Sequence, residues 1–166
     1  MTLRNLPIVW VVVLDAAAWT FFHLAISVAM ERISHGWFVQ HARLFRPLSF
    51  EQGGALWDRL FRVRSWKSLI PDGTLFIRSG YSKKALHGSA EEDFARFAAE
   101  SRRAELTHWL SILPAFLFFL WNPVWAGWLN VAYALLFNVP IILAQRFNRP
   151  RLERLLKRKS KRPSAD

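Results

Sequence analysis

Three long apolar stretches restrict the folds open to this chain more than any other feature. Residues 7–30, 106–121 and 124–145 contain almost no charged side chains. A helix rises about 1.5 Å per residue, so about 20 apolar residues cross a hydrocarbon core of about 30 Å. The sequence therefore predicts an all-α membrane protein with about three transmembrane helices, organised as a single integral membrane domain over residues 1–166.

The second and third stretches are separated only by Asn122-Pro123, which is a turn signal. We expect 106–121 and 124–145 to form an antiparallel hairpin. Pro114 interrupts 106–121, and proline is tolerated in a membrane helix when neighbouring groups satisfy the freed carbonyl. A re-entrant hairpin that does not fully cross the bilayer is the alternative.

The charge distribution predicts an orientation. The net charge is +11, with thirteen Lys and Arg between the first and second stretches, nine after Gln145, and only Arg4 before the first. The positive-inside rule places the N-terminus outside the cell membrane, with region 31–104 and tail 146–166 in the cytoplasm. With so many apolar residues, anionic lipid headgroups are a better partner than nucleic acid.

The region between the first two stretches is expected to contain interfacial helices. Residues Leu56 to Phe61 alternate apolar and charged side chains at helical spacing, typical of a basic amphipathic helix on a membrane surface. His35 to Phe45 suggests a second such helix, and Leu75 to Arg78 a short strand. Ser89 to Glu92 fits a capping box that starts a helix leading into the second stretch. The tail Arg149 to Arg162 is predicted to be a basic helix or a disordered arm.

Glu105 and His108 are the strongest candidates for chemistry, because an i, i+3 pair shares one face of a helix. A carboxylate orients an imidazole and supports its charged form, which suits a general base. The same spacing also supplies two metal ligands, or a helix-entry pair with no chemical role. The chain has no Cys, which excludes thiol nucleophiles and Cys-ligated zinc.

Further polar residues lie inside the apolar stretches. Counted along the helices, His23 and Asn138 lie at about the depth of His108 in the membrane. They are either part of a polar cluster or residues that form hydrogen bonds between packed helices. Asp15 lies near the midplane, where an ionised carboxylate must be paired, protonated or hydrated. Ser111 follows His108 by one turn, but no triad accompanies it.

Basic residues gather at the predicted inner boundary. Snorkelling and lipid contact account for most of them. A few are candidates for binding a phosphate-bearing donor, because guanidinium groups bind phosphate in a bidentate manner. They include Arg64, Lys67, Arg103 and Arg149.

Several segments resemble the glycosyl-4,4'-diaponeurosporenoate acyltransferases, small membrane enzymes of carotenoid biosynthesis. The resemblance runs from about Phe50 to Leu152. It is carried by Phe61-x-Val63-Arg64-x-Trp66-Lys67, Asp72-Gly73, Arg102-Arg103-Ala104-Glu105-Leu106-x-His108-Trp109-x-Ser111-Ile112-Leu113-Pro114, Asn138-Val139-Pro140-Ile141-Ile142, and Gln145-Arg146-Phe147-Asn148-Arg149-Pro150-Arg151-Leu152.

The resemblance implies transfer of a fatty acyl chain to a sugar hydroxyl of a lipid-like acceptor. On chemical grounds we assign His108 as base, with Glu105 or Asp72 as its orienting partner. Trp66, Asn148, Asn138 and His23 join the four cations as candidates for substrate or donor binding. We expect no metal and no cofactor beyond an acyl donor, which is acyl-CoA, acyl carrier protein or a phospholipid. The alternatives are a non-catalytic membrane module that binds anionic lipid or partner helices, and another membrane-bound lipid transferase.

Overall fold

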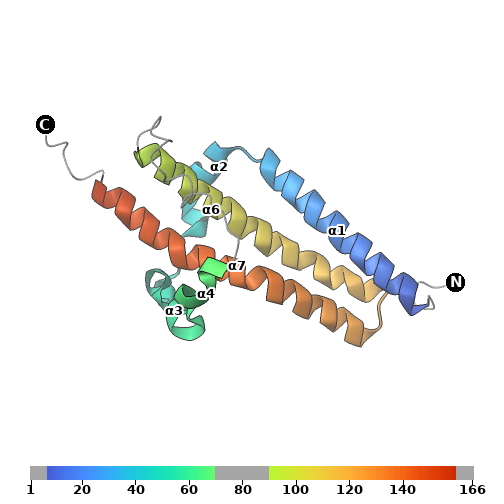
Figure 1. Ribbon diagram of the computed structural model, residues 1–166. Coiled ribbons are helices and arrows are strands. Elements are labelled where there is room, and N and C mark those ends of the chain that lie inside the picture. Colours follow the sequence, from blue (N-terminus) through green and yellow to red (C-terminus); the bar gives the residue numbers. More distant parts are fainter. Residues whose placement is uncertain (1–6, 70–89, 160–166) are drawn as a thin grey trace, which may run out of the picture. The chain divides into compact units, whose positions relative to one another are not determined.

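The computed structural model describes residues 7–69 and 90–159, and all its regular elements there are helical, which confirms the all-α prediction for this part of the chain. Asp72 and the strand expected at Leu75 to Arg78 lie outside the described residues, as does Ser89. Figure 1 labels the helices. They are α1 (Ile8–Arg32), α2 (His35–Gln40), α3 (Ala55–Phe61), α4 (Val63–Trp66), α6 (Ala90–Ile112) and α7 (Val124–Lys159), with 3-10 segments η2 (Ala42–Phe45), η3 (Ser49–Gly54), η4 (Lys67–Leu69) and η5 (Leu113–Leu120).

The chain divides into two compact units. The first unit combines α1, up to Ile33, with Leu106–Pro140. The second unit combines the residues from Ser34 to Glu105 with those from Ile141 onward. The division falls within α6 and α7, so each of these helices contributes to both units.

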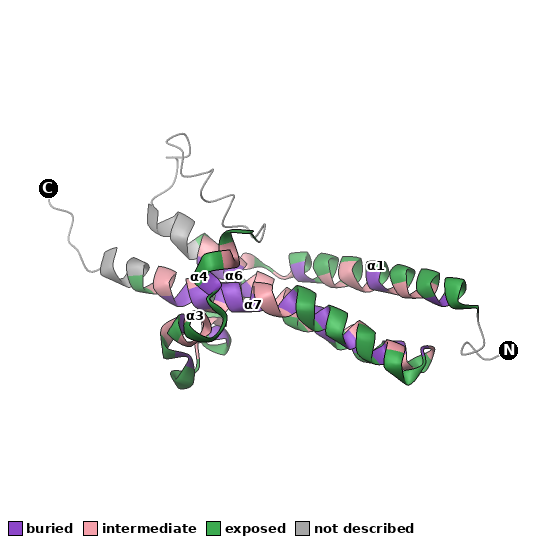
Figure 2. Ribbon diagram, turned by 60° about the horizontal axis from the view of Figure 1, so that its bottom comes forward, coloured by how far each residue is buried: buried purple, intermediate pink, exposed green. Residues whose placement is uncertain are grey.

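Two helical segments, Ile8–Arg32 and Val124–Arg154, are long and apolar enough to cross a membrane. The first agrees closely with the predicted span 7–30. Only 6% of the residues in its most apolar 18-residue stretch are buried, and Figure 2 shows α1 as largely exposed. Large apolar surfaces that a protein does not bury against itself are typical of contact with membrane or partners.

The predicted span 106–121 does not form one uninterrupted α-helix. The α-helix ends at Ile112, and Leu113–Leu120 continues as a 3-10 segment with Pro114 at its start. Proline has no N–H to donate to the preceding turn and its ring crowds the carbonyl four residues earlier, which accounts for the change at this point.

The core of the first unit surrounds Trp19 of α1. Its ring stacks on Phe118 with centroids 4.6 Å apart, and Ala115, Val131 and Ala134 are buried with it. Gly127 lies so close to Phe119 that an added Cβ would stand 2.4 Å from the ring. The absence of a side chain at Gly127 therefore lets α7 approach η5 closely.

The second unit contains the expected helix at Leu56 to Phe61, as α3. The segment before it turns sharply, because Gln52, Gly53 and Gly54 all have positive φ. An added Cβ at Gly54 would stand 2.8 Å from the Arg146 carbonyl oxygen and 3.0 Å from the Phe147 Cα. The bare backbone of Gly54 is therefore what allows η3 to lie against α7.

Helix α7 continues beyond Gln145, the expected end of the third stretch, as far as Lys159. The described part of the tail is therefore the basic helix and not the disordered arm. Because the helix continues, Arg146, Arg149 and Glu153 are placed on consecutive turns, where they meet side chains of the other elements of the second unit.

Candidate functional site

His108 and Asn138 are brought together in the first unit. A hydrogen bond of 2.8 Å joins His108 Nδ1, on α6, to Asn138 Oδ1, on α7. The Asn138 side chain also donates from Nδ2 to the Ala134 carbonyl at 2.8 Å. Asn138 is only 3% exposed, while His108 is half-buried. The imidazole is thus held by one nitrogen in a largely apolar part of the chain.

His23 belongs to the same neighbourhood. Its ring stacks on Trp19 with centroids 5.4 Å apart, and it is close enough to His108 for the two side chains to interact electrostatically. His23, His108 and Asn138 are thus polar residues of the first unit, and their contacts are compatible both with the expected polar cluster and with the alternative of hydrogen bonds between packed helices. Ser111 is buried, and its hydroxyl donates to the Thr107 carbonyl at 2.8 Å, which does not favour a nucleophilic role.

Asp15 is paired by hydrogen bonds from three side chains. Trp121 Nε1 and Asn122 Nδ2 donate to Asp15 Oδ1 at 2.7 and 2.8 Å. Asn130 Nδ2 donates to Asp15 Oδ2 at 3.2 Å. Asn130 Oδ1 accepts in turn from Trp19 Nε1 at 2.7 Å. A carboxylate in an apolar helix needs such donors, and here they tie α1 to both ends of the Trp121–Asn130 segment.

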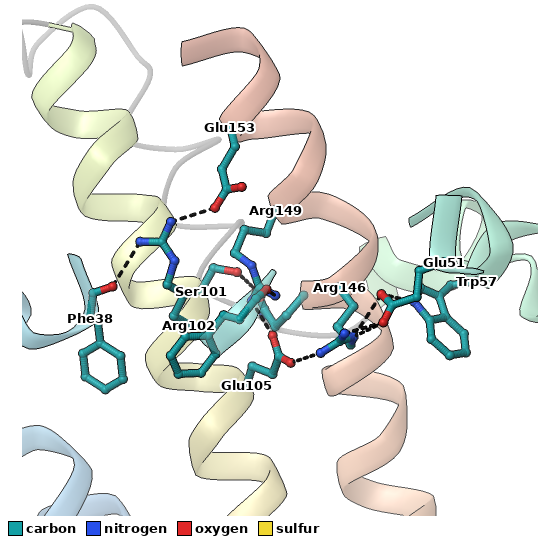
Figure 3. Close-up of polar contacts among 11 residues, drawn as sticks. Phe38, Glu51, Trp57, Ser101, Arg102, Glu105, Arg146, Arg149 and Glu153 are labelled. Carbon is teal, nitrogen blue, oxygen red and sulfur yellow. Dashed lines mark hydrogen bonds and ion pairs between the residues drawn. The ribbon is translucent and has the colours of Figure 1, made fainter. Parts of the chain in front are cut away.

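Glu105 occupies a buried ion cluster in the second unit (Figure 3). Arg146 Nη1 donates to its Oε1 at 2.6 Å, and Arg149 Nη1 donates to its Oε2. Arg146 also pairs with Glu51, and Arg149 also donates to the Phe45 carbonyl. Glu51, Glu105 and Arg149 are each 1–2% exposed. Two carboxylates and two guanidinium groups balance in charge, as buried ions require.

The ion cluster favours the charged form of the Glu51 carboxylate. Burial acts to raise the pKa of Glu51, but hydrogen bonds from Arg146 and Trp57 and the positive charge of Arg146 together outweigh it. The pKa of Glu51 therefore lies below its ordinary value. Trp57 Nε1 donates to Glu51 Oε2 at 3.1 Å, which attaches α3 to the cluster.

A second ion pair lies on the same two helices. Arg102 Nη2 donates to Glu153 at 2.7 Å, and its Nη1 donates to the Phe38 carbonyl at 3.3 Å. Ser101 donates to Gln145 at 2.8 Å (Figure 3). Helices α6 and α7 are thus joined by polar contacts in the second unit.

These contacts correct one expectation. His108 Nδ1 has Asn138 as its partner, and both Glu105 oxygens are bonded to arginines. The i, i+3 spacing places Glu105 and His108 on one face of α6, but two guanidinium groups attract a carboxylate more strongly than a neutral imidazole does. Glu105 is therefore not the orienting partner that we expected for His108.

The other candidate donor-binding residues belong to the second unit. Lys67 Nζ donates to Asn148 Oδ1 at 2.7 Å and lies 4.9 Å from the Phe147 ring centroid. Trp66 Nε1 donates to the Phe61 carbonyl, and Arg64 is 69% exposed in its side chain.

Arg103 and Arg149, both candidates for donor binding, differ in how accessible they are to a phosphate group. Arg103 is partly exposed, bonded to Glu100 at 3.0 Å and stacked over Phe38. Arg149 is buried and donates to Glu105 and to the Phe45 carbonyl, so the structure does not favour phosphate binding by Arg149.

Sequence reasoning did not single out Glu51 or Asn130, and it named Arg146 only within the resemblance and Asn122 only as part of a turn. Glu51 carried a usable signal, because Glu51 and Asp58 are the only acidic residues in the basic stretch from Arg32 to Lys67. No group of three or more His, Asp or Glu suited to a metal ion occurs among the described residues.

Comparison with known proteins gives a consistent result. The family model for glycosyl-4,4'-diaponeurosporenoate acyltransferase matches residues 41–158. A relative of that name from Staphylococcus haemolyticus (strain JCSC1435) is 40% identical over 149 residues, covering 90% of this chain and 86% of its own. Another, from Staphylococcus aureus (strain Newman), is 38% identical over 147 residues, covering 87% and 88%. No solved structure matches this chain.

Proposed function

Because this chain belongs to the glycosyl-4,4'-diaponeurosporenoate acyltransferase family, we propose that it transfers a fatty acyl group to a sugar hydroxyl of a glycosylated carotenoid. The observation that carries the proposal is the family match, which extends over 41–158 and includes both residues of the His108–Asn138 pair. The names of the relatives supply the acceptor class, and the hydrogen-bonded imidazole supplies a suitable base.

His108 is the proposed general base. Its Nδ1 is engaged by Asn138, so Nε2 remains to take the proton of the acceptor hydroxyl. The hydroxyl oxygen then attacks the carbonyl carbon of the acyl donor, and the bond to the donor's leaving group breaks as the tetrahedral intermediate collapses. The proton held by His108 passes to the leaving group. The products are the sugar ester and the protonated leaving group, so atoms and charges balance.

The donor-binding role is proposed for the more exposed cations of the second unit. Acyl-CoA, acyl carrier protein and phospholipid all carry phosphate, which Lys and Arg bind. The candidates for binding this phosphate are Arg64, Arg103 and Lys67, which is hydrogen-bonded to Asn148. Trp66 directly precedes Lys67 in the sequence. No cofactor other than the acyl donor is required by this chemistry.

We further propose that the chain is a multi-pass membrane protein. Two apolar helices support this, together with the apolar segment 106–121. In the proposed topology the N-terminus is outside, 106–121 and 124–145 form a hairpin, and 31–104 and 146–166 are cytoplasmic and contact anionic lipid. Lateral access from the bilayer lets the acyl chain and the carotenoid remain in lipid during the reaction.

The proposal is tested by lipid mass spectrometry of cells that make the glycosylated carotenoid, with and without this protein. The expected result is a new species heavier by one fatty acyl group, formed by the wild type and lost with His108→Ala. The matched control is His35→Ala, because His35 is a half-exposed histidine of the second unit outside the polar cluster of the first. Both variants must be inserted in the membrane in equal amounts.

Two results would count against the proposal. If no acylated product forms with any of the three donor classes, the chain acts as the non-catalytic lipid-binding alternative. If the product forms at full rate with His108→Ala, acyl transfer stands but His108 is not the base.

A further inference from the structure

The hydrogen bonds around Asn138 carry an inference that rests on the proposed role of His108 as base. Asn138 lies between two fixed partners, the His108 ring and the carbonyl of Ala134, one turn earlier on α7. It is 3% exposed, so water does not compete effectively for its amide. The orientation of this amide therefore determines which nitrogen of the neutral imidazole carries the hydrogen.

The Ala134 carbonyl sets that orientation. A backbone carbonyl only accepts hydrogen bonds, so the NH₂ group of Asn138 must face it, as the 2.8 Å contact from Nδ2 shows. Turning the amide over would place Oδ1 against the carbonyl oxygen and leave both without a proton between them. Asn138 Oδ1 is consequently the atom that faces His108.

Because Asn138 Oδ1 is an acceptor, the imidazole nitrogen 2.8 Å away must carry a hydrogen. We infer that Asn138 is a positioning residue that holds neutral His108 in the tautomer with the proton on Nδ1, which keeps the lone pair on Nε2. An amide achieves this without placing a second charge beside the imidazole. In apolar surroundings this matters, because a charged partner would itself have to be desolvated.

This assignment changes the role expected for Asn138 from substrate binding to control of the base. It also explains why a histidine that has no carboxylate on Nδ1 is still suited to catalysis. The tautomer is fixed by an amide that α7 provides, and the amide is in turn fixed by the backbone of α7.

The test is ¹⁵N NMR of the full chain in lipid nanodiscs, with ¹⁵N-labelled histidine and the His108 signals assigned from His108→Gln. At a pH where His108 is neutral, the expected wild-type spectrum has a protonated Nδ1 and an unprotonated Nε2. Asn138→Leu should shift the population toward the Nε2-protonated form or a mixture.

The matched control is Asn130→Leu. Asn130 also lies on α7 and donates to the carbonyl four residues earlier, Ala126, at 3.1 Å, but it serves the Asp15 network. It should leave the His108 tautomer unchanged even if the unit is weakened. In the acylation assay, Asn138→Leu should lower kcat at least tenfold with little change in KM.

An Nε2-protonated His108 in the wild type would overturn the inference, and this needs no variant to fold. An unchanged tautomer in folded Asn138→Leu would overturn it as well. Neither result depends on activity. The inference and the proposed function can therefore fail separately, since the proposed acyl transfer is refuted when cells with this protein form no acylated carotenoid, and the proposed role of His108 as base is refuted by full transfer with His108→Ala.

Discussion

Replacing Glu105 by glutamine removes the negative charge that faces two arginines in the second unit. The carboxylate is 2% exposed, and Arg149, its more buried partner, is 1% exposed. After the change, Arg146 retains Glu51, but Arg149 faces a neutral amide and the Phe45 carbonyl, so its positive charge is uncompensated. Glu105→Gln should therefore destabilise the second unit more than its small change in shape suggests.

The magnitude follows from burial. Removing one partner of a buried ion pair costs about 3–5 kcal/mol, because the remaining charge cannot be solvated. For a chain of this size each kcal/mol lowers Tm by roughly 2–4 °C, so the expected decrease is about 6–20 °C. Thermal unfolding in detergent or nanodiscs, followed by intrinsic tryptophan fluorescence, measures it.

Glu100→Gln is the matched control. Glu100 lies on the same helix and pairs with Arg103 at 3.0 Å, but its side chain is 44% exposed. Exposed ion pairs contribute about 0–1 kcal/mol, so Tm should fall by less than about 4 °C. If the two variants unfold at the same temperature, the cluster around Glu105 is not a buried ion network and the reasoning fails.

Two further predictions concern the segment that meets α7. Gly54→Ala should lower stability by about 2 kcal/mol or more, because the residue has φ +90° and an added Cβ would stand 2.8 Å from the Arg146 carbonyl oxygen. Gly36→Ala, where the nearest atom is 3.9 Å away, should have little effect on Tm, and equal effects would contradict this account. Glu51 has a lowered pKa when folded, so its contribution is present above the ordinary Glu pKa of about 4.3 and is lost as the pH falls through the lower folded value. Unfolding measured between about pH 5 and pH 3 should therefore depend less on pH in Glu51→Gln than in the wild type, and parallel curves would exclude this role.

The sequence was sufficient for the elements that depend on local pattern. The apolar run at 7–30 became α1 with nearly the same limits, and the amphipathic spacing around Trp57 became α3. Pro114 marked the point where the second stretch stops being an α-helix. Each of these outcomes is governed by neighbours in the chain, so each is readable from composition and spacing.

The polar partners depend on contacts far apart in the chain, and sequence spacing did not reveal them. Glu105 finds its cations 41 and 44 residues later, at the start of the tail that was predicted to be a basic helix or a disordered arm. Counting along the helices did indicate that His108 and Asn138 lie close together, because regular helices convert residue number into distance. Which nitrogen of His108 bonds to which atom of Asn138 required the side-chain geometry.

The three donors around Asp15 also have a consequence for the order in which the protein assembles. Trp121 and Asn122 follow Asp15 by 106 and 107 residues, so the ribosome makes them long after the first helix has emerged. In a bilayer a charged aspartate at the centre of a helix costs about 2.5–3.5 kcal/mol on insertion scales. In the proposed multi-pass topology the first helix bears this cost alone during synthesis, and the later arrival of the Trp121–Asn130 segment removes it. The first helix is thus fully stabilised only after the later segment that carries its hydrogen-bond donors has been synthesised.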